Sequence, residues 1–448
     1  MELRKKGLMS EGVIWKQIIL FTIPLLIGNL FQLLYNTVDS VVVGQYVGSD
    51  ALAAVGASNP IINLLIGFFM GLSSGAGVVV SQYFGARNHD YLKDSVHTTL
   101  ALALCSGFIL MIGGYLLSPW MLSATGTPIR VMDSSVLYLR VYFLGIIPVM
   151  IYNMSAGILR AVGDSKRPLF YLFVGCGINI FLDLLFVINF KMGVSGVAWA
   201  TLIAQSVSAI LAMIHLCRVK DVYKVTISKI RFKRAVLGRI VKIGLPSGLQ
   251  QSIISFSNLL VQSQINSFGP LAMAGCSSYN KIDAFAALPI QSFNLTITTF
   301  VGQNMGAKQY ERVKQGIKTC MFLTLTVTVF LSVFIYVGAD QLLSIFSNEP
   351  EVLYYGHYMM SIMAPAYIFL AISNIFCGAV RGAGSATPPM LILVFCYCIA
   401  RQVWIYLAMP YFQDIVIVFW GYSLTWILAA ILSTLYYYKS NWMARYSR

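Results

Sequence analysis

The segment Gln82–Arg87, with the sequence QYFGAR, returns as QNMGAK at Gln303–Lys308 in the second half of the chain. Two more segments repeat in the same order at nearly the same spacing. The paired residues are Gly157, Arg160, Gly163 and Pro168 with Gly378, Arg381, Gly384 and Pro389, and Leu52–Ser58 with Leu271–Ser277. When the two halves are aligned by these repeats, Pro24 of the first half falls near Pro246 of the second. Three repeated segments in the same order and at nearly constant spacing indicate an internal duplication of the chain.

The composition indicates a membrane protein. The 448 residues are 58% hydrophobic and 10% charged, with a mean hydropathy of +0.75, whereas about a quarter of the residues of a soluble protein are charged. Runs of about 20 apolar residues suit transmembrane helices. They predict helices at 14–45, 51–80, 95–117, 134–158, 169–189 and 194–216, then at 240–267, 272–302, 316–338, 356–380, 388–409 and 415–437.

We therefore expect an all-α integral membrane protein with twelve transmembrane helices in two pseudo-symmetric six-helix bundles. The bundles comprise residues 1–217 and 243–448, joined by a basic linker at 218–242. Six crossings separate the halves, so both begin on the same membrane side and the repeat is parallel. Parallel repeats around a cavity are typical of transporters.

The basic residues predict the orientation. Twenty-six of the 31 Lys and Arg residues fall in segments that share one side if the helices alternate. This positive-inside pattern places both termini in the cytoplasm of a multi-pass protein of the cell membrane. It also explains the net charge of +15 without a nucleic-acid partner. The apolar run at the N-terminus is too long for a signal peptide, so we expect it to remain as the first helix.

Three acidic residues lie well inside apolar spans: Asp39, Asp183 and Asp283. A carboxylate at a helix centre costs roughly 2.5–3.5 kcal/mol on insertion scales, which favours a functional role. Counting from the outer turns at about 1.5 Å per residue places Asp39, Asp183 and Thr201 at similar depth. Asn179 lies one turn from Asp183 on the same helix face.

These four residues predict an ion site in the first half. Two neighbouring carboxylates in a low dielectric favour binding of a proton, and the oxygen ligands also suit Na⁺. The alternative is a buried polar network that only holds helices together. The repeat places apolar or aromatic residues at the matching second-half positions: Leu260 or Val261, Ala400, Trp404 and Tyr422. If the cluster binds an ion, only the first half of the chain couples transport to that ion.

Other polar residues within the spans are candidates for a substrate cavity. Lys281 and Asp283 are two apart, so on a helix they face different ways, and we expect each to find a partner on another helix or in a watery cavity. Arg401 is a third candidate for that network. Further residues that could line a central cavity are Gln250, Gln251, Gln291 and Asn294. The alternative for these is hydrogen bonding between helices.

With its duplicated layout and the repeated Gln82–Arg87 and Leu159–Gly163 signatures, the chain resembles the multidrug and toxic compound extrusion (MATE) family over nearly its whole length. The resemblance is closer to the DinF-type branch, which implies an acidic residue late in the first helix, matched by Asp39. It also implies a first-half cation site matched by Asn179, Asp183 and Thr201, and a bending proline matched by Pro24. The NorM-type branch uses second-half carboxylates on its seventh and tenth helices, which this chain lacks there.

From these observations we expect a monomeric secondary exporter, not an enzyme, with H⁺ or Na⁺ as coupling ion and no other cofactor. It would export organic cations or amphipathic drugs by alternating access. The alternatives are a lipid or lipid-linked oligosaccharide flippase of the same superfamily, an integral-membrane transferase, or a channel. The sequence shows neither the acidic metal-binding motif of such transferases nor the charged rings of a channel.

Overall fold

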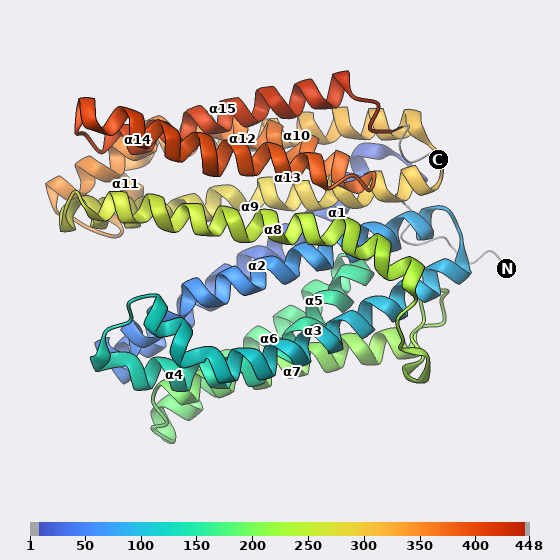
Figure 1. Cartoon of the computed structure of the whole chain (residues 1–448), viewed down its shortest axis with the longest axis horizontal. Coiled ribbons are helices and arrows are strands. Elements are labelled where there is room, and N and C mark those ends of the chain that lie inside the picture. The colour runs from blue at the N-terminus through green and yellow to red at the C-terminus, as the bar shows by residue number, and fades with distance from the viewer. Residues whose placement is uncertain (1–8, 444–448) are drawn as a thin grey trace. The chain divides into compact units, whose positions relative to one another are not determined.

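The computed structural model describes residues 9–443, and the described chain is helical without a β-strand. The first half contains α1 (Ile14–Val42), α2 (Ser49–Gly85), α3 (His89–Ala124), α4 (Ile129–Leu144), α5 (Ile146–Ala161), α6 (Lys166–Leu184) and α7 (Val194–Arg218). The second contains α8 (Arg234–Asn266), α9 (Pro270–Gly306), α10 (Tyr310–Val337), α11 (Ala339–Ser344), α12 (Pro350–Gly382), α13 (Thr387–Val394), α14 (Arg401–Phe412) and α15 (Val416–Lys439). Figure 1 shows them as long helices within each half.

Helices occupy each of the twelve predicted ranges. Within the described residues, ten spans are long and apolar enough to cross a membrane, and α4 with α5, bent by 48°, makes an eleventh. The remaining long helix, α8, has 33 residues. It begins with Arg234 and carries Gln250 and Gln251 in mid-helix, so it is more polar than the other spans.

The duplication extends to individual turns. Four positions with a positive φ angle recur at the offset of the sequence repeat, to within one position. The pairs are Gly48 (113°) and Gly269 (99°), Arg87 (53°) and Lys308 (57°), Gly163 (87°) and Gly384 (94°), and Lys191 (51°) and Gln413 (44°). The two halves therefore end their helices with the same backbone geometry.

The repeated sequence signatures are helix-ending turns. At the end of α2 the N–H of Asn88 donates to the Tyr83 carbonyl at 3.1 Å, and the N–H of Arg87 donates to the Phe84 carbonyl at 3.1 Å. This is the Schellman motif, which satisfies carbonyls that a helix end leaves open. The equivalent bonds end α5, α9 and α12. The motifs that identified the duplication thus have a structural cause.

The described chain forms two compact units, and both α1 and α8 pass from one to the other. The first unit runs from Ile23 to Leu245, and the second combines Met9–Thr22 with the chain from Pro246 onward. The crossing points coincide with Pro24 in α1 and Pro246 in α8. A proline inside a helix removes one backbone hydrogen bond and permits a bend, so each crossing lies at a local weak point of its helix.

The glutamines of the repeated signature secure these exchanged helix starts. In the second unit the Gln303 Oε1 accepts the backbone N–H of Met9 at 2.7 Å. In the first unit the Gln82 Oε1 accepts from Arg239 Nη2 of α8 at 3.0 Å. Equivalent residues of the repeat therefore bind the first helix of the opposite half.

A second pair of equivalent contacts lies deeper along the same helices. In the second unit the hydroxyls of Thr22 and Thr296 are 2.8 Å apart. At the matching place in the first unit, a Cβ added to Gly75 would lie 2.4 Å from the Gly244 Cα. Backbone contact replaces the hydroxyl pair there, and only glycine permits it.

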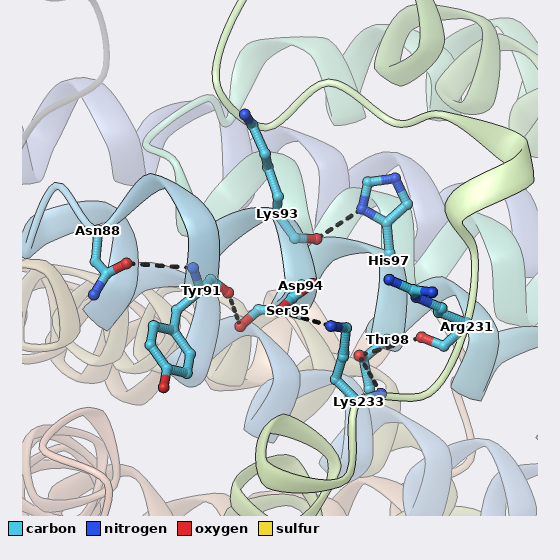
Figure 2. Close-up of polar contacts among 9 residues, drawn as sticks. All are labelled: Asn88, Tyr91, Lys93, Asp94, Ser95, His97, Thr98, Arg231 and Lys233. Atoms are coloured by element: carbon cyan, nitrogen blue, oxygen red, sulfur yellow. Dashed lines mark hydrogen bonds and ion pairs between the residues drawn. The ribbon is translucent and has the colours of Figure 1, made fainter.

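The linker between the halves is docked on the first unit. Figure 2 shows its end lying along α3, with Lys233 near Asp94 and Thr98. The N–H of Thr226 donates to His97 Nε2 at 3.1 Å, and the N–H of Lys233 donates to Thr98 Oγ1 at 3.2 Å. Lys233 Nζ is 3.6 Å from Asp94 Oδ2.

Two apolar contacts add to this docking. Tyr223 and Val225 are 5% and 2% exposed and belong to the core between α3, α5 and α7. Burial raises the pKa of the Tyr223 phenol to about 12, so the ring stays neutral near pH 7. The linker is thus an ordered part of the first unit.

Candidate functional site

The predicted ion site lies inside the first unit, where two irregular turns meet. Asp39 on α1 is followed by the π-helical turn η1 (Val43–Val47), and Asp183 on α6 is followed directly by η2 (Leu185–Asn189). The two turns pack against each other. Single π-helical turns inside α-helices are frequent at functional sites. Here they bring the two carboxylate-bearing helices together.

The two carboxyl groups are close neighbours. The side chain of Asp39 lies within hydrogen-bonding range of the Asp183 carboxyl. The Asn179 amide, oriented to donate, bridges them, with Nδ2 at 2.9 Å from Asp39 Oδ1 and 3.2 Å from Asp183 Oδ2. A carboxylate only accepts hydrogen bonds, so a bond between two carboxyl groups requires one proton. This arrangement therefore suits a protonated pair.

Hydroxyl groups complete the cluster. The amide of Asn179 is 3.4 Å from Thr201 Oγ1 on α7. The Tyr35 hydroxyl bonds both Thr201 and Asp39, and Tyr138 of α4 interacts electrostatically with both carboxyl groups. The structure thus brings together all four residues predicted from the sequence.

Sequence reasoning missed the two tyrosines. Tyr35 is four residues before Asp39, hence one turn away on the same face of α1, and this spacing was a signal. Tyr138 lies on α4, far in the sequence from Asp39 and Asp183, so nothing in its own segment indicated the site.

Burial leaves one acceptor of the site without a partner. Asn179 and Asp183 are 0% exposed, and Asp183 Oδ1 is buried without a hydrogen-bond partner among the described residues. A buried, unpaired carboxylate oxygen is costly unless a ligand pairs with it. A proton or Na⁺ fits this donor set of carboxylate, amide and hydroxyl oxygens. The described residues contain no group of three His, Cys, Asp or Glu side chains for a transition metal.

In the second unit, Asp283 is bound by tyrosines. It accepts from the Tyr279 hydroxyl at 3.2 Å and from the Tyr367 hydroxyl, and the two hydroxyls are 2.8 Å apart. Among the described residues it forms no ion pair with Lys281 or Arg401. It is therefore a satisfied, partly buried acceptor, unlike Asp183.

The two basic candidates have neutral partners. Arg401 is 2% exposed, donates to Asn258 Oδ1 at 3.2 Å and lies 4.2 Å from the centre of the Tyr422 ring. The Nζ of Lys281 lies 4.9 Å from the Phe346 ring. The structure thus does not join Lys281, Asp283 and Arg401 by ion pairs within the residues that it describes.

The remaining polar candidates divide into two groups. Gln250 Oε1 accepts from Arg381 at 3.3 Å, and Asn294 donates to Asn374 at 2.8 Å, which are hydrogen bonds between helices. Gln251 and Gln291 are exposed. Pro24 is buried within α1, next to the point where that helix changes unit.

Two halves that repeat in sequence and in backbone geometry, each built from long helices, are typical of secondary transporters. The MatE family model matches residues 24–185 and 246–407. The chain therefore belongs to the MATE family of transporters and is a multi-pass membrane protein. The two matched segments begin at the paired prolines Pro24 and Pro246, which reproduces the internal repeat.

Named relatives and solved structures agree with this assignment. The probable multidrug resistance protein YoeA of Bacillus subtilis is 30% identical over 393 residues, covering 86% of this chain and 85% of the relative. The probable multidrug resistance protein NorM of Thermotoga maritima is 24% identical over 435 residues, covering 96% and 93%. A MOP superfamily transporter from Pyrococcus furiosus matches with a TM-score of 0.92 at 23% identity over 99% of both chains. This structural match confirms the predicted twelve-helix fold.

Proposed function

We propose that this protein exports organic cations or amphipathic drugs across the cell membrane in exchange for H⁺ or Na⁺. The family and the printed names of relatives such as YoeA support drug export. The contact between Asp39 and Asp183, with the unpaired Oδ1 of Asp183, supports the ion-coupling role. This carboxyl pair is the observation that carries the proposal.

The proposed direction of transport follows from the charge distribution. The basic segments place both termini in the cytoplasm, and residue counting places the carboxyl pair toward the outer side of the membrane. The ion then enters the site from outside while the drug leaves the cell. Inward movement of one positive charge supplies about 2.3 kcal/mol per 100 mV of membrane potential.

Ion binding drives export only if it favours one conformation over the other. Asp39 lies on α1, whose start belongs to the second unit and whose remainder belongs to the first. A change at Asp39 therefore acts on a helix that is covalently and structurally shared by both units. We propose that binding of H⁺ or Na⁺ changes α1 near Pro24 and so favours the drug-releasing state. The site residues and the hinge match the DinF-type branch.

Transport by purified protein in liposomes tests the proposal. Drug export is measured with an imposed pH gradient and, separately, with an imposed Na⁺ gradient. Asp39→Asn and Asp183→Asn are each expected to abolish gradient-driven export, because neither amide can take up a proton or neutralise a cation. Asp340→Asn is the matched control, since Asp340 is exposed and its side chain contacts His357.

Three outcomes contradict the proposal. Full gradient-driven export by the Asp39→Asn/Asp183→Asn double variant would exclude the coupling site. Lipid scrambling that needs no gradient would indicate a flippase. An ohmic ion current would indicate a channel.

A further inference from the structure

A groove in the second unit lies outside the ion site, on the side of the membrane that carries the basic loops. It occupies about 890 Å³ between the start of α10, Phe376 of α12 and the end of α15. Lys314 and Lys318 line one side, and Tyr437 and Trp442 line the other. The groove thus combines positive charge with aromatic rings.

The apolar part of the groove follows α10 into the membrane. Its lining continues from Lys314 through Met321 and Phe322 to Leu325. At a helical rise of about 1.5 Å per residue, this path measures about 16 Å. Phe322 is 70% exposed on a span that crosses the bilayer, so this end of the groove opens toward lipid.

The aromatic wall is fixed by its own contacts. The rings of Phe376 and Tyr437 are 4.6 Å apart, and those of Tyr437 and Trp442 are 5.4 Å apart. Trp442 is 3% exposed and donates Nε1–H to the Tyr437 carbonyl at 3.0 Å. Tyr and Trp rings are enriched at the level of lipid headgroups. The aromatic wall is therefore expected to lie at headgroup level.

The polar end of the groove has free hydrogen-bonding capacity. Lys318 forms no ion pair among the described residues, whereas Lys314 Nζ is 2.7 Å from Glu311 Oε1. Ser440 lines the groove, and its Oγ is buried without a hydrogen-bond partner in the described chain. A buried hydroxyl without a partner is unfavourable, and an oxygen of a bound ligand would satisfy it. Two cations and a hydroxyl at headgroup level are suited to a phosphate ester.

We propose that this groove binds one anionic phospholipid of the leaflet that faces the basic loops. The phosphate lies between Lys314 and Lys318, the Ser440 hydroxyl donates to an ester or phosphate oxygen, and one acyl chain follows α10 past Met321 toward Leu325. The lipid site is separate from the ion site, because the groove belongs to the second compact unit and the carboxyl pair belongs to the first. It adds a structural lipid to the transporter.

Native mass spectrometry of the full-length protein in detergent tests the site. Phosphatidylglycerol, phosphatidylcholine and soluble glycerol phosphate are titrated separately. One tightly bound phosphatidylglycerol is expected, with weaker phosphatidylcholine binding and no binding of glycerol phosphate. Lys314→Ala/Lys318→Ala is expected to weaken phosphatidylglycerol binding about tenfold, since a basic residue near an anionic lipid contributes about 1 kcal/mol and Glu311 already offsets part of one charge.

The controls separate lost binding from lost folding. Lys314→Arg/Lys318→Arg keeps both charges and is expected to retain the lipid. Lys224→Ala/Lys229→Ala removes two charges from the linker and is expected to leave the affinity unchanged. Equal binding of both lipids, or equal loss in the linker variant, would overturn the proposal.

Discussion

Two consecutive glycines of α3 allow a matched test of the packing around the ion site. A Cβ added to Gly113 would have no heavy atom within 4 Å, whereas one added to Gly114 would lie 2.2 Å from Phe143 Cδ1 and 2.4 Å from Phe143 Cγ. Phe143 is 1% exposed and shares a core cluster with Tyr138, which interacts electrostatically with the carboxyl pair. Gly114→Ala therefore disturbs that cluster, and Gly113→Ala does not.

The expected free energies differ in sign. Replacing a mid-helix glycine by alanine stabilises by roughly 0.5–1 kcal/mol, so Gly113→Ala gains about that amount. Gly114→Ala gains the same term but overpacks the core, which costs about 1–3 kcal/mol. The clash includes Cγ, which lies on the χ2 axis, so rotation of the ring about the Cβ–Cγ bond cannot remove it. We expect Gly114→Ala to be less stable than Gly113→Ala by about 1–3 kcal/mol.

Thermal unfolding of the purified variants in the same detergent measures this difference, either as the transition midpoint or as the half-life at one temperature. Gly113→Ala is expected above the unchanged protein and Gly114→Ala below it. Equal stability of the two variants would refute the close contact between α3 and Phe143. A loss of stability in Gly113→Ala alone would refute the assignment of the open face.

Further variants test the site and the turns. Tyr35→Phe removes the hydroxyl that bonds Asp39 and Thr201. It is expected to weaken the ion dependence of export about tenfold or more, since a hydrogen bond to a charged group contributes about 1.5–3 kcal/mol. Unchanged ion dependence would contradict this expectation. Asp283→Asn is expected to retain gradient-driven export, because the amide oxygen still accepts from the tyrosines, and loss of coupling would place an ion site in the second unit. Lys308→Gly is expected to raise stability by up to about 1 kcal/mol, because glycine adopts the left-handed turn without strain; a lower unfolding temperature would contradict it.

Much of the fold follows from short-range rules. The apolar runs and the repeat predicted the helices, because a bilayer fixes the length of a span. Counting at a constant helical rise then placed Asp39, Asp183 and Thr201 at one depth, and the structure brings them together in one cluster. The bend between α4 and α5 was not predicted, because Gly145 is an ordinary residue within an apolar run.

Partners on distant helices could not be read from the sequence. Asp283 was considered with Lys281 and Arg401, since opposite charges in an apolar medium attract, yet its ligands are tyrosine hydroxyls of two helices. Arg401 is held by neutral oxygens and a ring. A helical pattern indicates which face is buried, but it does not indicate which helix covers that face.

The exchanged start of α1 has a consequence for how the protein is made. The N–H of Met9 bonds a residue 294 positions later in the chain. At a synthesis rate of about 5–20 residues per second, the ribosome needs roughly 15–60 s to produce that partner. The start of α1 is therefore synthesised before the residues that it contacts in the second unit. Neither half of the gene, cut at the linker, would encode a complete folding unit.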